Sequence, residues 1–154
     1  TDFYKHSTEN KLFSITYTII ELLSIVEATY DFDNIKIYVT SIEEEISFGN
    51  VNEFSQVIFS ILNNARDIFK IRNIDKPEIH IAVENKKMTI RDNGGGIEEE
   101  LLEDIFLASM STHGSTGIGL YLSKNIIEKN NGVITASNDK DGAVFTIEFL
   151  TWID

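Results

Sequence analysis

Two spacings of hydrophobic residues alternate along this chain of 154 residues. Apolar side chains recur every three or four positions in three stretches, which predicts amphipathic helices at 14–30, 50–68 and 120–130. Between these stretches apolar and polar residues alternate, as in half-buried strands. The strands are expected at 11–13, 35–39, 45–49, 78–83, 87–91, 133–137 and 143–149. This order predicts an α+β sandwich of two layers, in which three helices cover one face of a mixed, mostly antiparallel sheet.

The second predicted helix has a surface divided into two stripes. Asn50 and Glu53 are expected to form a capping pair at its start. The stripe expected to face the core holds Phe54, Val57, Ile58, Ile61, Ala65 and Ile68. A polar stripe flanks that face and holds Gln56, Ser60, Asn64 and Asp67. Because a flank lies beside the core, these polar side chains are expected to face a cleft.

Glycine is concentrated in one part of the chain. Six of the nine glycines lie between Arg91 and Leu120, in two clusters. Glycine adds no side chain to a core, so such clusters mark backbone that turns sharply or approaches a ligand closely. The first cluster follows Asp92, which stands at the end of a predicted strand and can accept a hydrogen bond. The second cluster leads into the third helix, whose free N-terminal amides can bind a phosphate.

Composition limits the possible functions. A chain of this length with 42% hydrophobic residues is expected to form one domain. The net charge of -12 argues against nucleic-acid binding, which depends on clustered Lys and Arg. A nucleotide is compatible, because backbone amides and a divalent cation can hold phosphates on an acidic protein. No cysteine is present, and no apolar run approaches the ~20 residues that span a bilayer. We therefore expect a cytoplasmic fragment without membrane contact or thiol chemistry.

Four motifs, taken in order, resemble the ATP-binding catalytic domain of sensor histidine kinases, within the wider group of gyrase, mismatch-repair ATPases and heat-shock chaperones. The resembling segments are the asparagine box at 60–65 (SILNNA), the first glycine box at 92–97 (DNGGGI), the lid at 104–113 and the second glycine box at 117–120 (GIGL). Each motif alone is weak and could be an ordinary turn, but their order and spacing match the family. The resemblance implies a Bergerat-type ATP-binding fold over 11–154, with 1–10 as a linker or the tail of a preceding phosphoacceptor helix.

The resemblance also implies roles for individual residues. Asp92 would accept a hydrogen bond from the adenine amino group, Asn64 would hold Mg²⁺, and His113 or Ser111 would reach the γ-phosphate. Asn64 and His113 are the implied catalytic residues. Phosphoryl transfer needs positioning and charge neutralisation more than covalent chemistry. The residues implied to contact ATP are Asn64, Asp92, Gly94, Gly96, Ile97, Phe106, Ser111, Thr112, Thr116, Gly117, Ile118, Gly119 and Leu120.

The activity implied by the resemblance is transfer of the γ-phosphate of Mg-ATP to a histidine on a separate helical domain. His6, His80 and His113 all lack the acidic helical setting of such an acceptor. The implied partners are the nucleotide, the dimerisation and phosphoacceptor domain of the same protein and, indirectly, a response regulator. The isolated domain is expected to be a monomer that hydrolyses little ATP.

Several residues depart from the family pattern. Ser60 stands where the family usually has the first Asn of its asparagine box, and Asp67 where a basic residue is common. Both changes weaken a phosphate and metal site. Arg66 could compensate, although helical spacing points it away from Asn64. His113 replaces the usual lysine of the lid and is a cation only part of the time near neutral pH.

Three alternatives to a histidine kinase stay open. A gyrase-type ATPase would need a Glu general base one turn before Asn64, where this chain has Ser60. A protein serine kinase shares the same boxes and lacks the same base here. The third alternative is a degenerate nucleotide-binding or signalling module with little kinase activity.

Overall fold

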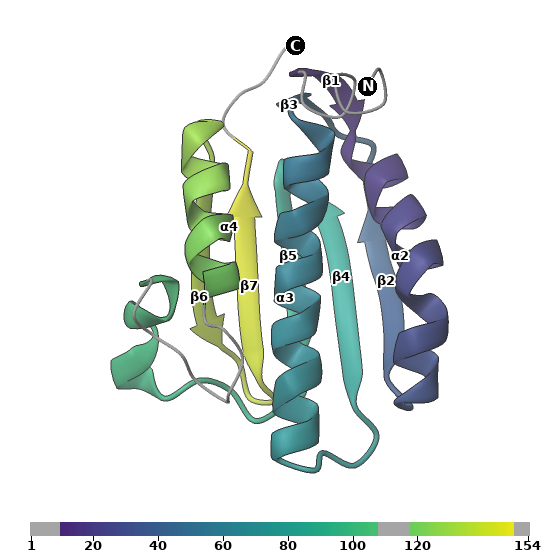
Figure 1. Ribbon diagram of the computed structural model, residues 1–154, viewed down its shortest axis with the longest axis vertical. Helices are drawn as coiled ribbons and strands as arrows, with labels where there is room; N and C mark the ends of the chain where they lie inside the picture. The colour runs from purple at the N-terminus through teal and green to yellow at the C-terminus, as the bar shows by residue number, and fades with distance from the viewer. Residues whose placement is uncertain (1–9, 108–117, 150–154) are drawn as a thin grey trace.

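The chain forms a five-stranded sheet covered on one face by three α-helices (Figure 1). The computed structural model describes residues 10–107 and 118–149. The α-helices of this part are α2 (Ile15–Phe32), α3 (Val51–Ile71) and α4 (Ile118–Lys129). The strands follow the order β2 (Lys36–Ile42), β4 (Glu78–Glu84), β5 (Lys87–Asp92), β7 (Ala143–Glu148) and β6 (Val133–Asn138). The predicted α+β sandwich is confirmed.

The sheet is mixed, as predicted. β2 runs parallel to β4, whereas every other pair of neighbours is antiparallel. The turn between β4 and β5 is tight because Asn85 and Lys86 both adopt left-handed backbone conformations, with φ of 54° and 62°. Two further strands, β1 (Lys11–Ser14) and β3 (Ile46–Gly49), pair with each other in a separate small sheet.

The two faces of the large sheet differ in polarity. On β4 the residues that face the helices, Ile79, Ile81 and Val83, are completely buried. The opposite face carries a row of threonines across three strands, in which Thr146 of β7 lies between Thr89 of β5 and Thr135 of β6. The core therefore lies between the sheet and the helices, as the strand alternation predicted.

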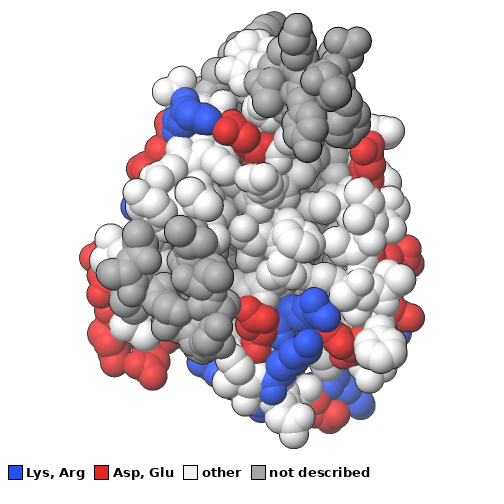
Figure 2. Space-filling model, in the orientation of Figure 1, with Lys and Arg blue, Asp and Glu red and all other residues white. Residues whose placement is uncertain are grey.

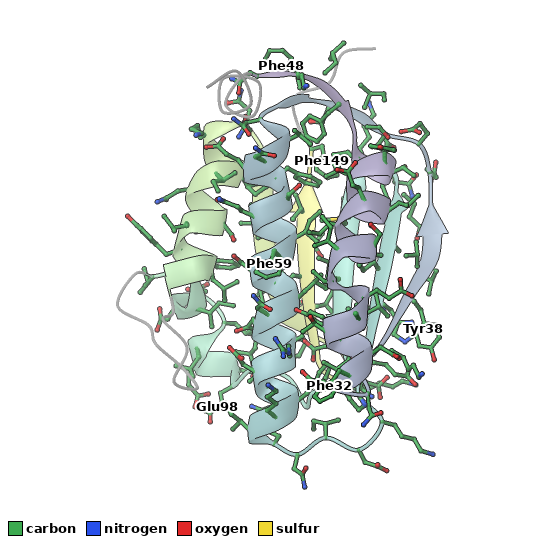
Figure 3. The ribbon with its side chains drawn as sticks, turned by 45° about the vertical axis from the view of Figure 1, so that its right-hand side comes forward. Phe32, Tyr38, Phe48, Phe59, Glu98 and Phe149 are labelled. Carbon is green, nitrogen blue, oxygen red and sulfur yellow. The ribbon has the colours of Figure 1, made fainter. Side chains whose placement is uncertain are left out.

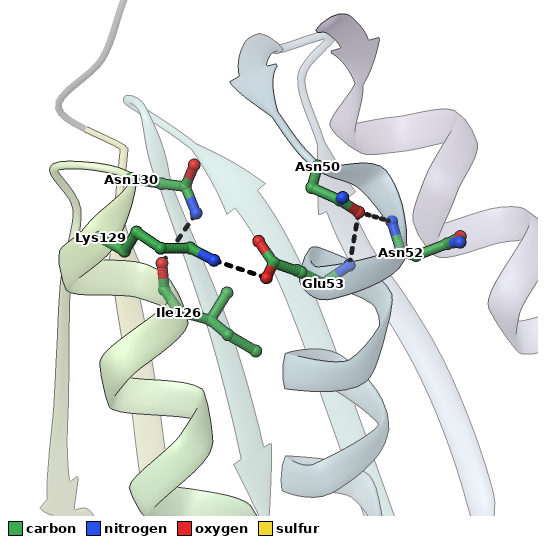
Figure 4. Close-up of polar contacts among 6 residues, drawn as sticks. All are labelled: Asn50, Asn52, Glu53, Ile126, Lys129 and Asn130. Carbon is green, nitrogen blue, oxygen red and sulfur yellow. Dashed lines mark hydrogen bonds and ion pairs between the residues drawn. The ribbon is translucent and has the colours of Figure 1, made fainter. Parts of the chain in front are cut away.

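The helix starts follow the predicted caps in part. The Ser14 hydroxyl accepts a hydrogen bond from the Tyr17 amide, and the Asn50 side chain accepts from the amides of Asn52 and Glu53. Such caps contribute about 1 kcal/mol each. The predicted pair of Asn50 and Glu53 therefore forms through the amide of Glu53, whereas the described residues show no hydrogen bond to Asn50 from the side chain of Glu53. Its carboxylate instead pairs with Lys129 of α4 at 2.6 Å, across the gap between the two helices (Figure 4).

The inner face of α3 forms the centre of the core. All six residues of its predicted core stripe are at most 7% exposed, and Leu62 and Phe69 join them. Figure 3 shows Phe149 inside the molecule, whereas Phe59 on the outer side of α3 points away from the core. The helical period therefore predicted correctly which side of α3 faces the core. Both flanks of α3 contact other helices, and Ser60 of the polar stripe lies against Gly119 at the start of α4.

Charged side chains of the helix face gather toward its rim, and the middle of that face is largely uncharged (Figure 2). Each of the three helices carries exposed apolar residues, among them Ile20 of α2, Phe59 of α3 and Leu122 of α4. No helix in the described ranges has the length and apolar content needed to cross a bilayer.

Candidate nucleotide site

Asp92 lies at the end of β5 with its carboxylate inside the protein. Only 8% of the residue is exposed. Its Oδ1 accepts hydrogen bonds from the amide of Gly94 at 2.9 Å and, more weakly, from the amide of Ala143 at 3.4 Å. The described residues provide no hydrogen-bond partner for Oδ2. A buried anionic oxygen without a partner is costly, so Asp92 is suited to accept a hydrogen bond from a ligand.

A cavity lies beside Asp92, between the C-terminal half of α3 and the start of α4. Its empty volume is about 570 Å³, including its open mouth. Four separate regions of the sequence supply its wall. The lining residues are Asn64, Ile68, Arg72, Asp92, Gly96, Ile97, Glu98, Leu101, Ile105, Leu120 and Ala143. Five of the residues predicted to bind the nucleotide therefore share one cavity: Asn64, Asp92, Gly96, Ile97 and Leu120.

The polar stripe of α3 is turned toward this region. Asn64 lines the cavity, and one turn earlier Ser60 faces the start of α4. A Cβ atom added to Gly119 would lie 3.3 Å from the Ser60 hydroxyl. The two elements approach closely because Gly119 has no side chain. The departure at Ser60 thus leaves a small hydroxyl, rather than an amide, opposite the first turn of α4.

Two predicted site residues lie next to the cavity without lining it. Gly94 supplies the amide bonded to Asp92, and a Cβ atom there would come within 2.7 Å of the Ile68 side chain. Phe106 lies in the short 3₁₀ helix η2 (Asp104–Phe106), where it is 6% exposed and packs edge-on against Phe145. Its neighbour Ile105 lines the cavity instead.

Several other predictions fall outside the described residues. Ser111, Thr112, His113, Thr116 and Gly117 belong to this group, as does the side chain of Ile118, the first residue of α4. Their roles stay predictions.

Arg66 does not replace the missing basic residue of the asparagine box. Its Nε donates to Asp33 at 2.6 Å, and its guanidinium lies over the Tyr30 ring, so it faces α2. The neighbouring Asn63 also faces α2, because its side chain accepts a hydrogen bond from the Tyr30 hydroxyl. Asn63 and Asn64 are adjacent in sequence, but Asn63 bonds to α2 whereas Asn64 lines the cavity.

Three contacts that shape the site were also not predicted from the sequence. Arg72 follows α3 and lines the cavity. Asn138 ends β6 and bonds to Ile97. Gly142 packs directly on Asp92, since an added Cβ atom would lie 2.1 Å from the Asp92 carbonyl oxygen. No spacing within the chain signals these contacts, because each joins segments that only the folded sheet brings together.

Burial raises the pKa of the Asp92 carboxyl above its usual value, against the opposing effects of its two backbone hydrogen bonds and Arg72. A carboxyl with a higher pKa in the folded chain contributes stability below its unfolded pKa, near 4, and loses it as the pH rises through the folded pKa. At neutral pH the ionised group therefore opposes folding. We expect Asp92→Asn to gain stability relative to the parent as the pH rises from about 4 to 7. Urea unfolding of both proteins without nucleotide measures this difference, and a pH-independent difference would contradict it.

The protein has a helical layer over a mixed sheet and a cavity that the carboxylate at the end of β5 reaches. ATP-binding domains of the histidine kinase and gyrase group share this architecture. Residues 49–152 match the family described as "Histidine kinase-, DNA gyrase B-, and HSP90-like ATPase", and the chain belongs to that family. The resemblance found in the sequence is confirmed, and with it the use of a nucleotide.

Two relatives of the chain carry the names of sensor proteins. The chain is 33% identical over 110 residues to the two-component sensor PprA of Pseudomonas aeruginosa, covering 64% of this chain and 12% of PprA. It is 28% identical over 129 residues to the sensory histidine kinase/phosphatase NtrB of Vibrio alginolyticus, covering 80% of this chain and 36% of NtrB. The chain thus spans a minor part of these relatives. The catalytic domain of histidine kinase ThkA superposes with a TM-score of 0.79 at 26% identity, covering 92% of this chain and 95% of that domain.

Proposed function

We propose that this chain is the ATP-binding catalytic domain of a sensor histidine kinase. It binds Mg-ATP in the cavity between α3 and α4 and presents the γ-phosphate to a histidine on a separate helical domain. The observation that carries this proposal is the Asp92 carboxylate, which is buried in a cavity wall with one oxygen fixed by backbone amides and the other left for a ligand.

The base end of the cavity suits adenine. The 6-amino group of adenine is a neutral hydrogen-bond donor, and Asp92 supplies a negatively charged acceptor, which strengthens the hydrogen bond. Apolar side chains of Ile68, Ile97 and Leu101 line the cavity beside it and can contact the faces of a planar base. A purine with an oxygen at position 6 would place an acceptor against the carboxylate and bind less well.

The phosphate end of the cavity is formed by α3 and the start of α4. Asn64 supplies one amide oxygen there. Magnesium usually takes one or two protein oxygens and completes its shell with water and substrate phosphates. A single amide oxygen is therefore a sufficient protein ligand, and no cluster of three acidic, His or Cys side chains is found in the described chain. When bound, Mg²⁺ would neutralise phosphate charge, and Asn64 would hold it.

The amides at the start of α4 complement this charge. α4 has 12 residues and follows a glycine-rich segment, and Gly119 lies in its first turn. The unpaired amides at a helix N-terminus bind anions. Ser111, Thr112, His113, Thr116 and Gly117 are proposed to add further contacts to the phosphates.

The partners follow from this role. Residues 1–10 are proposed to join the domain to a dimerisation and phosphoacceptor helix on the cytoplasmic side of a sensor protein. The response regulator would receive the phosphate from that helix. Ser60 disfavours a gyrase-type ATPase, because a hydroxyl cannot act as the carboxylate base that activates water.

Calorimetric titration with a non-hydrolysable ATP analogue tests the proposal, with and without Mg²⁺. We expect binding that Mg²⁺ strengthens, and Asn64→Ala to lose most of that strengthening, about tenfold in affinity. Asn63→Ala is the matched control, because Asn63 faces Tyr30 of α2 and should leave the Mg²⁺ effect intact. No binding at millimolar analogue would overturn the kinase proposal and favour the degenerate module.

A further inference from the structure

The glycine turn, defined here as Gly94–Ile97, is held by side chains from two distant elements. Arg72 leaves the end of α3 and crosses to this turn. A single nitrogen of its guanidinium, Nη1, donates to the carbonyl oxygens of Gly94 at 2.7 Å and Gly96 at 2.8 Å. One side chain therefore fixes the distance between two carbonyl groups of the same turn.

A second side chain holds the far end of the glycine turn. Asn138, the last residue of β6, pairs with Ile97 as a backbone peptide group would. Its Oδ1 accepts from the Ile97 amide at 2.8 Å, and its Nδ2 donates to the Ile97 carbonyl at 2.6 Å. We call these two sets of contacts, from Arg72 and from Asn138, the clamps of the glycine turn. Between them, the Gly95 amide donates to the carbonyl of Asp141 at 3.1 Å.

These contacts leave room only for glycine. Gly95 and Gly96 have φ of 96° and 86°, a region that other residues rarely adopt. A Cβ atom on Gly95 would lie 3.0 Å from Arg72 Nη1, and one on Gly96 would lie 2.8 Å from Asn138 Oδ1. The glycines are therefore needed both for the backbone bend and for the close approach of Arg72 and Asn138.

Holding the glycine turn also holds the ligand-binding carboxylate. The Gly94 amide that donates to Asp92 Oδ1 is in the residue whose carbonyl Arg72 binds. Free glycine segments have high conformational entropy, which a ligand would otherwise have to remove on binding. Arg72 also lines the cavity, so its side chain lies at the boundary between the clamp and the ligand.

We propose that Arg72 and Asn138 are positioning residues that preset the adenine end of the nucleotide site before any ligand arrives. They fix the glycine turn, and the turn fixes Asp92 Oδ1 so that Oδ2 is directed to the 6-amino group. This inference rests on the proposed nucleotide site and adds to it the residues that determine base selectivity.

Binding of ADP and of inosine diphosphate, both with Mg²⁺, tests the inference. In the parent protein ADP should bind more tightly, because only adenine carries the 6-amino group. Arg72→Met should weaken ADP about tenfold and reduce the preference for ADP, whereas Arg72→Lys should restore part of both. Lys70→Met is the matched control, since it removes the same charge from the same helix on the side that faces Asp33. If the parent binds ADP and Arg72→Met keeps both the affinity for ADP and the preference over inosine diphosphate, the positioning role of Arg72 is wrong. The proposed nucleotide site would be unaffected by that result.

Amide hydrogen exchange without nucleotide supplies an independent result. The amides of Gly95 and Ile97 should be protected in the parent and should exchange faster in Arg72→Met and Asn138→Ala respectively, while thermal midpoints stay within about 2 °C. Rapid exchange at both amides in the parent would overturn the clamp even if ADP binds. A parent protein that binds neither nucleotide would overturn the proposed function. Amide exchange at Gly95 and Ile97 would then still show whether the clamps hold the glycine turn.

Discussion

Gly142→Ala is expected to destabilise the protein by roughly 3 kcal/mol, the upper end of the usual cost of overpacking, and to abolish nucleotide binding. The added Cβ atom would lie 2.1 Å from the Asp92 carbonyl oxygen and 2.7 Å from its Oδ1. Neither atom can move freely, because Asp92 pairs with Ile79 in the sheet and its Oδ1 bonds to Gly94. The turn at 139–142 would have to separate from β5. Urea unfolding and calorimetry with ADP measure the two effects.

Gly49→Ala is the control for this prediction. A Cβ atom there would also meet a near neighbour, but that neighbour is the end of the Asn130 side chain, at 3.0 Å. A side-chain end can shift where backbone cannot, and Gly49 is not among the residues that line the cavity. We expect a cost below about 1 kcal/mol and unchanged ADP affinity. Equal destabilisation of both variants would show that the contact with Asp92 has no special effect.

Asp92→Asn is expected to weaken ADP binding roughly 30- to 150-fold, which corresponds to about 2–3 kcal/mol for a hydrogen bond to a charged group. Asparagine keeps the shape of the side chain and its Oδ1 acceptor for Gly94, but it presents an amide donor to the adenine amino group, which is also a donor. Because the ionised carboxylate opposes folding at neutral pH, the variant should be at least as stable as the parent.

Loss of binding with retained stability separates a ligand contact from a structural one. Asp141→Asn provides the comparison, since it removes one negative charge from the neighbouring turn and its side chain is exposed. It should bind ADP like the parent protein. If Asp92→Asn binds ADP as well as the parent, Asp92 is only a turn residue and the adenine assignment fails.

The elements of this fold could be predicted because their signals are local. A period near 3.6 placed the buried side of α3 correctly from Phe54 to Ile68, and strand alternation identified the sheet. The strand end at Asp92 and the polar position of Asn64 were also visible in the sequence. Their meeting in one cavity followed from the family resemblance.

The remaining features depend on tertiary contacts. Glu53 has the spacing of a capping residue, but its carboxylate pairs with the positively charged Lys129 of α4. Phe106 matches the leading aromatic of the lid, yet it packs on Phe145 in the core. Gly142 looks like an ordinary turn glycine in sequence. Its contact with Asp92 exists only because β7 pairs beside β5.

The threonine row on the open side of the sheet has a consequence for solubility. Thr89, Thr146 and Thr135 lie in register across three neighbouring strands. Their branched shape favours extended backbone, and their hydroxyls keep that surface hydrated. Valines at these positions would preserve the strands but create a continuous exposed hydrophobic patch, which promotes self-association of sheets. The hydroxyls therefore favour contact of the uncovered face with water over contact with another sheet.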